Sequence, residues 1–571
     1  MAAARAKELA VAAGKFIDST PTPFHLCAQG AELLRAAGFV ELEETEAWRP
    51  LLKPGGNYFY VRGGTLVAFA IGAGFVSGGG FSIIGAHTDS PVLKLKPCSK
   101  RSSKGYQQVD VEAYGGGLWH TWFDRELSVA GEVIVRQPGG AFHKRLVCVR
   151  RPLLRIPTLC IHLQTADERA KFAVNKETHL QPILGMVAEA VNKPVADAPA
   201  DAAAHTPGAA AEADVPLEGR HAPALLALLG SELGCAPSDI MDFDLSLFDT
   251  QPAQVWGLSD EFLSAPRLDN QIHCFTALRA LIDRATAAPP AASDVSVIAL
   301  FDHEECGSES LSGAASPVMG EALQRVSSCF APDTHHAASE AQLVSTRRSF
   351  LLSSDVAHAV HPNYAEKHSP SHAPKLNSGI VIKSNDNQRY ATNAESGFVV
   401  RELARRNGLA VQEFIVKNDC PCGEERLPVW CDHRAHHRRQ DWAARHRPGD
   451  PLAQHALHTR DRGRDRHRHL APPLQRVPQL VRGARRRVLL RMQALRAHID
   501  RSPRPAELHC PLCGGQAGAR GHAPTRASND SGGCLVRAWR LAQGEDSRHR
   551  LGSTVHVIFF CSREISQLIC L

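Results

Sequence analysis

The sequence predicts an α/β fold: a mostly parallel sheet flanked by helices, with a β-rich domain inserted into it. In the first 91 residues and again after about residue 246, continuous apolar strand-like runs alternate with segments of helical spacing. This alternation is typical of a parallel sheet covered by helices on both faces. Residues 92–245 differ, because short strand-like runs there are separated by glycine clusters. The length of 571 residues and the hydrophobic content of 43% allow two domains and further segments.

The N-terminal elements follow from apolar periodicity and proline. Residues 2–39 predict two helices broken at residues 20–23, Thr-Pro-Thr-Pro, because proline stops a helix and biases the preceding residue to extended geometry. Strands are expected at residues 65–71 and 81–86, where apolar residues run together.

The inserted block predicts a sheet of its own. Strands are expected at residues 108–114, 131–136 and 146–149, with glycines at 115–117 and 139–140 punctuating them. Residues 194–219 are rich in Ala, Pro and Asp and have no apolar period, so we expect an exposed, disordered loop.

After residue 246 the pattern of the first domain resumes. The expected elements are helices at residues 268–284 and 396–406 and strands at residues 295–301, 349–353 and 380–383. The predicted domains are a discontinuous α/β domain of residues 1–91 and 246–423, the inserted domain of residues 92–245, and an Arg- and His-rich tail of residues 424–571 that we expect to be poorly ordered.

Residues that bind hard metal ions follow the ends of the predicted strands. They are His87 after strand 81–86, Glu304 and Glu305 after strand 295–301, and Asp355 after strand 349–353. Ligands of such sheets gather beyond the carboxyl ends of the strands. With Asp269, these residues indicate a two-metal hydrolase site that is one ligand short, since paired ions share a carboxylate and each needs further His or carboxylate ligands.

Each piece of this pattern has a plainer interpretation. A lone His after a strand is more often a hydrogen-bonded loop residue, and Asp269-Asn270 could be a helix cap. The adjacent Glu304 and Glu305 could be solvated, although neighbouring carboxylates repel one another unless a cation or a proton intervenes. The conjunction of four such positions favours the metal site.

Five motifs, taken together, resemble a known family. They are Ala-His-Thr-Asp-Ser-Pro at residues 86–91, Arg-Leu-Asp-Asn at 267–270, Asp-His-Glu-Glu-Cys-Gly at 302–307, Ser-Asp-Val-Ala-His-Ala-Val-His-Pro-Asn-Tyr at 354–364, and Asn-Gln-Arg-Tyr-Ala-Thr at 387–392. In this order they resemble the successive motifs of the aspartyl aminopeptidases, zinc aminopeptidases of the M18 group. The resemblance covers about residues 5–423.

The resemblance implies roles for the metal-site residues. It makes His87 and Asp355 terminal ligands, Asp269 the bridging carboxylate and Glu305 a further ligand of two divalent ions, expected to be zinc. Glu304 becomes the general base. This suits the chemistry, because a water acidified by metal needs an unligated carboxylate to move its proton to the leaving amine. Asp89 fits the acceptor that orients the ring of a ligating His87.

Substrate and assembly are also implied by the resemblance. Lys383, Tyr390 and His358 match positions that contact the substrate, and a buried Lys383 would suit peptides with an acidic N-terminal residue. His162, in the inserted domain, matches a histidine that the family contributes to a neighbouring subunit. By its position alone it is a core or surface His. The family assembles as a dodecamer, so the inserted domain is expected to serve oligomerisation.

Charge divides the chain at about residue 423. Residues 1–423 carry 38 Lys and Arg against 46 Asp and Glu, whereas residues 424–571 carry 27 against 13, and all 27 are Arg. A basic tail could bind nucleic acid through phosphates, although the near absence of Tyr and Phe at 424–550 counts against single-strand binding. The lack of a long apolar segment and the irregular spacing of the 16 cysteines predict a cytoplasmic protein with reduced thiols and no membrane partner.

The tail also lacks the last metal-ligand His of the family, which follows a Met and precedes Ser-Ile-Arg-Glu. Codons for residues 455–461 can encode Met-His-Ser-Ile-Arg-Glu when they are shifted by one nucleotide, which supports the hypothesis that residues 424 to at least 484 are frame-shifted or mis-spliced. A transcript that matches the printed residues in frame through position 484 would refute it. Two functional alternatives therefore remain: an active aminopeptidase, or a catalytically impaired relative without the final ligand.

Overall fold

The computed structural model describes residues 2–187, 217–287, 292–332, 334–418 and 553–558. Its larger sheet has the strand order β1-β2-β3-β13-β4-β14-β17-β15-β16, and parallel pairs predominate among these strands. In chain order the strands are β1 (Val40–Glu41), β2 (Asn57–Arg62), β3 (Thr65–Ile71), β4 (Phe81–His87), β13 (Val295–Phe301), β14 (Phe350–Ser353), β15 (Ile380–Ser384), β16 (Val411–Ile415) and β17 (Ser553–Ile558).

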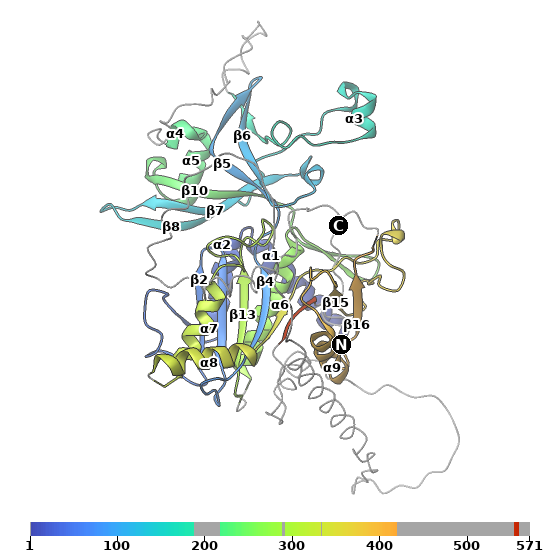
Figure 1. Ribbon diagram of the computed structural model, residues 1–571. Coiled ribbons are helices and arrows are strands. Elements are labelled where there is room, and N and C mark those ends of the chain that lie inside the picture. Colours follow the sequence, from blue (N-terminus) through green and yellow to red (C-terminus); the bar gives the residue numbers. More distant parts are fainter. Residues whose placement is uncertain (1, 188–216, 288–291, 333, 419–552, 559–571) are drawn as a thin grey trace, which may run out of the picture. The chain divides into compact units, whose positions relative to one another are not determined.

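Helices cover both faces of this sheet because its central strands are apolar on both sides. In β3, Leu66 and Ala68 pack into one core cluster with α2 and α6, while Val67 and Phe69, pointing the other way, pack into a second cluster with α7. Successive strand residues face opposite sides, so a continuous apolar run is buried on both faces. The predicted α/β fold with a mostly parallel sheet is confirmed (Figure 1).

The helices begin at recognisable caps. Thr22 caps α2 by accepting a hydrogen bond from the backbone N–H of His25, with Pro23 at the first helical position. Asn393 and Ser396 form a capping box at the start of α9. The helices of the α/β domain are α1 (Ala2–Ser19), α2 (Pro23–Ala36), α6 (Leu268–Thr286), α7 (Val318–Cys329), α8 (His335–Arg347) and α9 (Ala394–Arg406), with a 3-10 turn η5 at Ala365–Lys367.

A second sheet lies within the inserted block, and all its strand pairs are antiparallel. Its order is β8-β7-β10-β5-β6-β9, and its core is built on one face by residues such as Val129 and Leu247. The strands are β5 (Val92–Ser103), β6 (Tyr106–Tyr114), β7 (Leu127–Arg136), β8 (Phe142–Cys148), β9 (Ile183–Met186) and β10 (Ile240–Asp249). Shorter elements are η1 (Trp119–Trp122), η2 (Ile161–Leu163), α3 (Ala166–Ala170), α4 (Leu217–Arg220), α5 (Pro223–Leu233), η4 (Pro237–Asp239) and a ribbon of β11 (Gln254–Trp256) and β12 (Phe262–Ser264).

The predicted end of the inserted domain and the predicted end of the loop both differ from the structure. Strand β10 pairs with β7 as far as Asp249 opposite Leu127, so the inserted sheet continues past residue 245. Leu217 to Gly219, expected to be loop, belong to the helical turn α4. The remainder of the predicted loop, residues 194–216, and nearly all of the tail lie outside the described residues.

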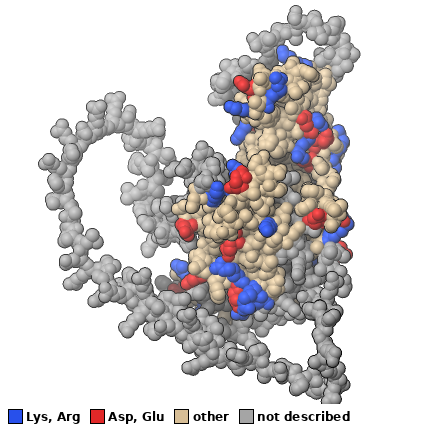
Figure 2. All heavy atoms as spheres, turned by 90° about the vertical axis from the view of Figure 1, so that its right-hand side faces the viewer, with Lys and Arg blue, Asp and Glu red and all other residues tan. Residues whose placement is uncertain are grey.

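The described surface carries mixed charge. On the face drawn in Figure 2, basic and acidic side chains are interspersed. Exposed ion pairs of the described chain include that between Arg401 and Glu413 at 2.8 Å. Among the described helices, none is long and apolar enough to cross a membrane. The cysteines with described side chains are free thiols, as predicted.

Candidate metal centre

The topology of the larger sheet brings the predicted ligands together. Strand β13 lies parallel to β4 with Phe301 opposite His87, so Glu304 and Glu305 leave β13 beside that histidine. Strand β14 lies parallel to β4 on its other side with Ser353 opposite Gly85, which places Asp355 at the same edge. Three neighbouring parallel strands thus deliver their following residues to one point.

Asp269 reaches this point from the start of α6. Its backbone is non-helical although it lies in the first turn, and its carbonyl oxygen accepts a 2.5 Å hydrogen bond from the Ser90 hydroxyl. The next residue, Asn270, is fully buried and donates its side-chain amide to the carbonyl of Ser354 at 2.8 Å. These contacts tie α6 to the loops that follow β4 and β14.

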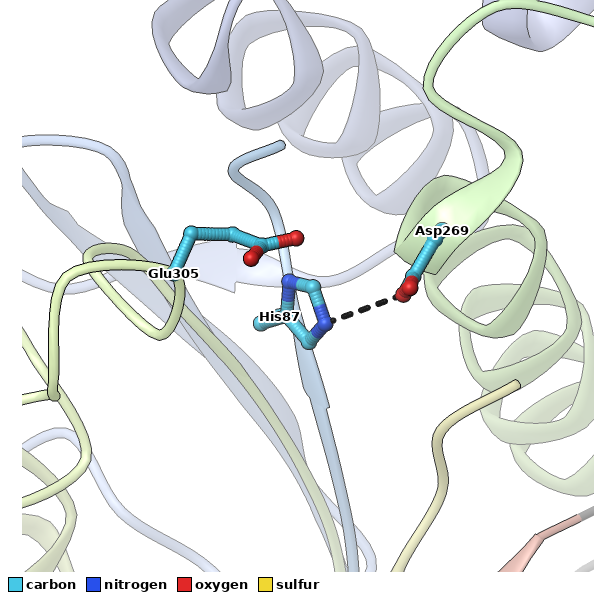
Figure 3. A group of neighbouring side chains, drawn as sticks. All are labelled: His87, Asp269 and Glu305. Carbon is cyan, nitrogen blue, oxygen red and sulfur yellow. Dashed lines mark ion pairs between the residues drawn. The ribbon is translucent and has the colours of Figure 1, made fainter. Parts of the chain in front are cut away.

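The His87 ring faces the carboxylates through one nitrogen. Its Nε2 lies 3.2 Å from Asp269 Oδ1, 3.7 Å from Asp355 Oδ1 and 3.9 Å from Glu304 Oε2. Figure 3 shows the ring between the side chains of Glu305 and Asp269. One ligand atom from each of His87, Asp269 and Glu305 lies within 4.8 Å of the other two, which is close enough for a shared ion.

The other nitrogen of His87 is held by Asp89. Nδ1 lies 3.0 Å from the Asp89 carbonyl oxygen and 3.4 Å from its Oδ1. A hydrogen bond from Nδ1–H to these acceptors leaves Nε2 with a free lone pair, which is the tautomer that a metal ligand requires.

Asp89 is itself fixed by donors. Its Oδ1 accepts the backbone N–H of Glu304 at 3.1 Å, and its Oδ2 accepts the backbone N–H of Glu305 at 3.0 Å and the hydroxyl of Tyr114 at 2.7 Å. Burial alone would raise the pKa of Asp89, but the hydrogen bonds with His87, Tyr114 and Glu305 lower it overall. Asp89 is therefore a buried, ionised carboxylate that is stabilised by the hydrogen bonds of the surrounding donors.

Most of the carboxyls around His87 have raised pKa values, because burial and mutual repulsion disfavour their ionised forms. Burial, reinforced by nearby carboxylates, raises the pKa of Glu304 to about 7 and that of Glu305 to about 9. Burial and the charge of Asp355 raise the pKa of Asp269 as well. Asp355 is the exception, since Lys383 and His87 outweigh its burial and lower its pKa. A cation at this point would favour the ionised form of all four carboxyls.

Two buried oxygens mark where such a cation fits. Glu305 Oε2 accepts no hydrogen bond from the described part of the chain, and neither does Asp269 Oδ1, which lies 3.2 Å from His87 Nε2. Buried carboxylate oxygens are normally paired, and an ion is one of the few explanations for those that are not. Imidazole nitrogen together with carboxylate oxygen is a zinc donor set, so the residues present fit the metal.

Lys383 lies next to the centre and contacts Asp355. It lies on β15, its Nζ donates to Asp355 Oδ2 at 3.1 Å and to the carbonyl of Val356 at 3.0 Å, and the ammonium sits 5.4 Å from the ring centre of Tyr390. His358 is exposed nearby, with its ring edge-on to Phe414 at 6.1 Å. Lys383 and Tyr390 thus lie together next to Asp355.

His162 lies apart from this cluster. It belongs to η2 and is exposed, and its flanking residues Ile161 and Leu163 expose 61% and 71% of their surface. His162 is a surface residue in the described structure. Its predicted role in a neighbouring subunit stays a prediction.

Sequence analysis missed Tyr114. Its strand and the glycines after it were predicted, but nothing in the local pattern connects residue 114 with residue 89. The signal is Gly115, which has φ +76° and where an added Cβ would lie 3.1 Å from the Cβ of Glu305. A glycine required by close approach marks the place where β6 reaches the metal centre.

A histidine and three carboxyls that follow parallel strands, joined by Asp269 from the start of α6, are typical of a metal-dependent hydrolase. Residues 16–430 match the family model described as aminopeptidase I zinc metalloprotease (M18). The chain belongs to this M18 family of zinc aminopeptidases, as the sequence motifs predicted.

Relatives and solved structures agree with this membership. The chain is 45% identical to an aspartyl aminopeptidase of Aspergillus oryzae over 435 residues, and 44% identical to a probable aspartyl aminopeptidase of Ricinus communis over 429 residues; each match covers 72% of this chain and 85% of the relative. A cryo-EM structure of the Ape4 and Nbr1 complex matches with a TM-score of 0.66 and 40% identity over 74% of this chain and 77% of that one. The S. cerevisiae mApe1 dodecamer matches with a TM-score of 0.60 and 30% identity over 72% and 85%.

Proposed function

We propose that this aminopeptidase removes N-terminal Asp and Glu residues from peptides with the help of two divalent ions, expected to be zinc. The observation that carries the metal assignment is the cluster of His87, Asp269 and Glu305, in which two buried carboxylate oxygens have no hydrogen bond within the described residues. Asp355, 3.7 Å from His87 Nε2, would be a further ligand, with Asp269 bridging the two ions.

Bound divalent ions supply Lewis acidity, which polarises a carbonyl and lowers the pKa of water toward neutrality. Glu304 would take the proton of the attacking water, because it is close to His87 Nε2 and is absent from the tightest ligand group. Bound cations would favour the ionised form of Glu304, which is the form that accepts a proton. As the C–N bond breaks, Glu304 would pass this proton to the leaving amine.

The acidic preference is proposed to come from Lys383. A buried ammonium next to the metal centre favours a negatively charged side chain, and a charge-assisted bond of this kind is about twice as strong as a neutral one. Tyr390 and His358 would line the same subsite. The relatives named aspartyl aminopeptidase support this preference.

Assembly is the second part of the proposal. The α/β domain, residues 1–91 and 246–423, would carry the chemistry, and the inserted block would join subunits into a homo-oligomer, a dodecamer by similarity to mApe1. The exposed apolar residues beside His162 support an interface there, since apolar side chains of this size favour burial against a partner. His162 would then enter the neighbouring subunit's site.

The test is direct. The purified full chain is loaded with zinc, its metal content is measured, and hydrolysis of Asp-, Glu- and Leu-4-nitroanilide is followed. Two ions per chain and faster turnover of the acidic substrates support the proposal. At most one ion and no turnover contradict it and favour the impaired relative that lacks a final ligand.

A further inference from the structure

The Tyr114 hydroxyl brings the second sheet into the metal centre. Tyr114 is the last residue of β6, and its hydroxyl donates to Asp89 Oδ2 at 2.7 Å. Gly115, at positive φ, then carries the chain past Glu305. The motifs of the catalytic chemistry do not include this tyrosine.

Asp89 is the point where these contacts act. Its carboxylate is 2% exposed and accepts two backbone N–H groups, those of Glu304 and Glu305, as well as the Tyr114 hydroxyl. The backbone N–H of Glu304 bonds to Oδ1, and the backbone N–H of Glu305 bonds to Oδ2. The Tyr114 hydroxyl is the side-chain donor among the three and shares Oδ2 with the backbone N–H of Glu305, so it contributes to the orientation of the carboxylate. Asp89 Oδ1 lies 3.4 Å from His87 Nδ1, beside the 3.0 Å contact of Nδ1 with the Asp89 carbonyl oxygen, so a turn of the carboxylate changes the acceptors that the ring meets.

Tyr114 is held in place by the second sheet. Lys94 of β5 lies 5.5 Å above its ring centre, and the same ammonium is 2.7 Å from Asp244 of β10. His303, after β13, contributes a ring contact at 6.1 Å. Burial, with the charge of Asp89, raises the pKa of Tyr114, so its hydroxyl remains a donor. A cation over an aromatic ring adds attraction that a bare apolar contact lacks.

We propose that Tyr114 is a positioning residue for the metal centre: through Asp89 it fixes the His87 ring with Nε2 toward Asp269, so that the second sheet sets the metal affinity. This rests on the proposed metal function. Partners one step behind a ligating histidine fix its tautomer and orientation, and their loss typically weakens metal binding about 10- to 100-fold.

Tyr114→Phe tests this by removing one oxygen and leaving the ring. The matched control is Tyr60→Phe, because the Tyr60 hydroxyl is also buried and donates at 2.7 Å, but to the Val318 carbonyl in the core. The full-length, metal-free proteins are titrated with Co²⁺, whose visible absorption reports ligand geometry, and with Zn²⁺ against a chromogenic chelator. Urea unfolding measures stability in parallel.

We expect Tyr114→Phe to weaken Co²⁺ and Zn²⁺ binding about tenfold or more and to shift the Co²⁺ spectrum. Tyr60→Phe should lose stability and keep the affinity and spectrum of the wild type. Equal affinities for Tyr114→Phe and wild type overturn the proposal, as does equal weakening in both variants, since that would be a stability effect. A wild-type chain that binds no metal overturns the metal function and this inference together.

Lys94→Met is the second variant, for use if Tyr114→Phe does not fold. It retains the hydroxyl but removes the cation above the ring. Weaker Co²⁺ binding than in the wild type supports the positioning role, and unchanged binding overturns it.

Discussion

Replacing Lys383 by Met should abolish the proposed preference for acidic N-terminal residues. Lys383 is 3% exposed, and its ammonium is bound to Asp355 Oδ2 at 3.1 Å and to the Val356 carbonyl. Met retains most of the apolar stem and removes the charge with its hydrogen bonds to Asp355 and Val356, so the packing of β15 should survive. The acidic side chain of the substrate would then lose its buried partner.

The magnitude follows from that burial. Truncating one partner of a buried, hydrogen-bonded charge pair costs about 2–5 kcal/mol. With tenfold per about 1.4 kcal/mol, kcat/KM for an Asp substrate should fall by about 30- to 3000-fold. A Leu substrate makes no such pair, so its kcat/KM should change by less than about threefold. The Asp-to-Leu ratio therefore isolates the role of Lys383.

The assay compares kcat/KM for Asp- and Leu-4-nitroanilide at full metal occupancy, because Lys383 also contacts a proposed metal ligand. Lys96→Met is the control: it breaks a 2.8 Å ion pair with Glu177, whose side chain is 74% exposed, and surface pairs of this kind contribute little. If Lys383→Met lowers both substrates by the same factor while metal content is unchanged, the specificity argument is wrong.

Three further predictions follow from other parts of the chain. Glu304→Gln should lower kcat by about 10²- to 10⁴-fold with zinc content retained; loss of zinc in step with activity would make Glu304 a ligand instead of the base. Burial, with Arg150 and Arg267, lowers the pKa of His25 to about 4 from the usual 6.5. The unfolded chain therefore binds a proton between pH 6.5 and 4 that the folded chain does not, and acidification from pH 7 to 4.5 should remove about 2 kcal/mol of stability in the wild type relative to His25→Gln, measured by urea unfolding. If the difference in free energy of unfolding between the wild type and His25→Gln is the same at pH 7 and pH 4.5, this prediction is wrong. Leu163→Asp places a charge on an exposed apolar segment and should reduce the assembly to smaller species in analytical ultracentrifugation, whereas a retained wild-type mass would place the interface elsewhere.

The central strands were predictable because their pattern has one structural explanation. Residues 65–71 and 295–301 are apolar on both faces and match β3 and β13 residue for residue. Strands β5 and β10 were missed, since charged residues such as Lys94 and Asp244 interrupt their apolar pattern. These charges pair with each other across the sheet, and a linear pattern does not reveal such a pairing. Helix α7 could have been found from Val318, Ala322 and Val326, which share one face at helical spacing.

The candidate site divides in the same way. Residues that follow parallel strands must meet at one edge of the sheet, so strand prediction alone brought together His87, Glu305 and Asp355. Asp269 was included in the predicted site for its residue type, but its bridging role came from the family motif, because the start of a helix can face several directions. Tyr114 was beyond both kinds of reasoning, as its contact with Asp89 depends on how a strand of the second sheet ends.

The number of ions that the chain binds depends both on the described ligands and on a ligand that only the sequence comparison points to. A catalytic zinc typically has three protein ligands, and His87, Asp269 and Glu305 supply three within 4.8 Å of one another. A second ion would share Asp269 and take Asp355, which leaves it one protein ligand short among the described residues. In the family that ligand is a histidine, and here its codon is hypothesised to be out of frame near residues 455–457, outside the described residues. If the transcript restores that histidine, the restored chain should bind the second ion more tightly than the printed one, because only the second centre gains a donor.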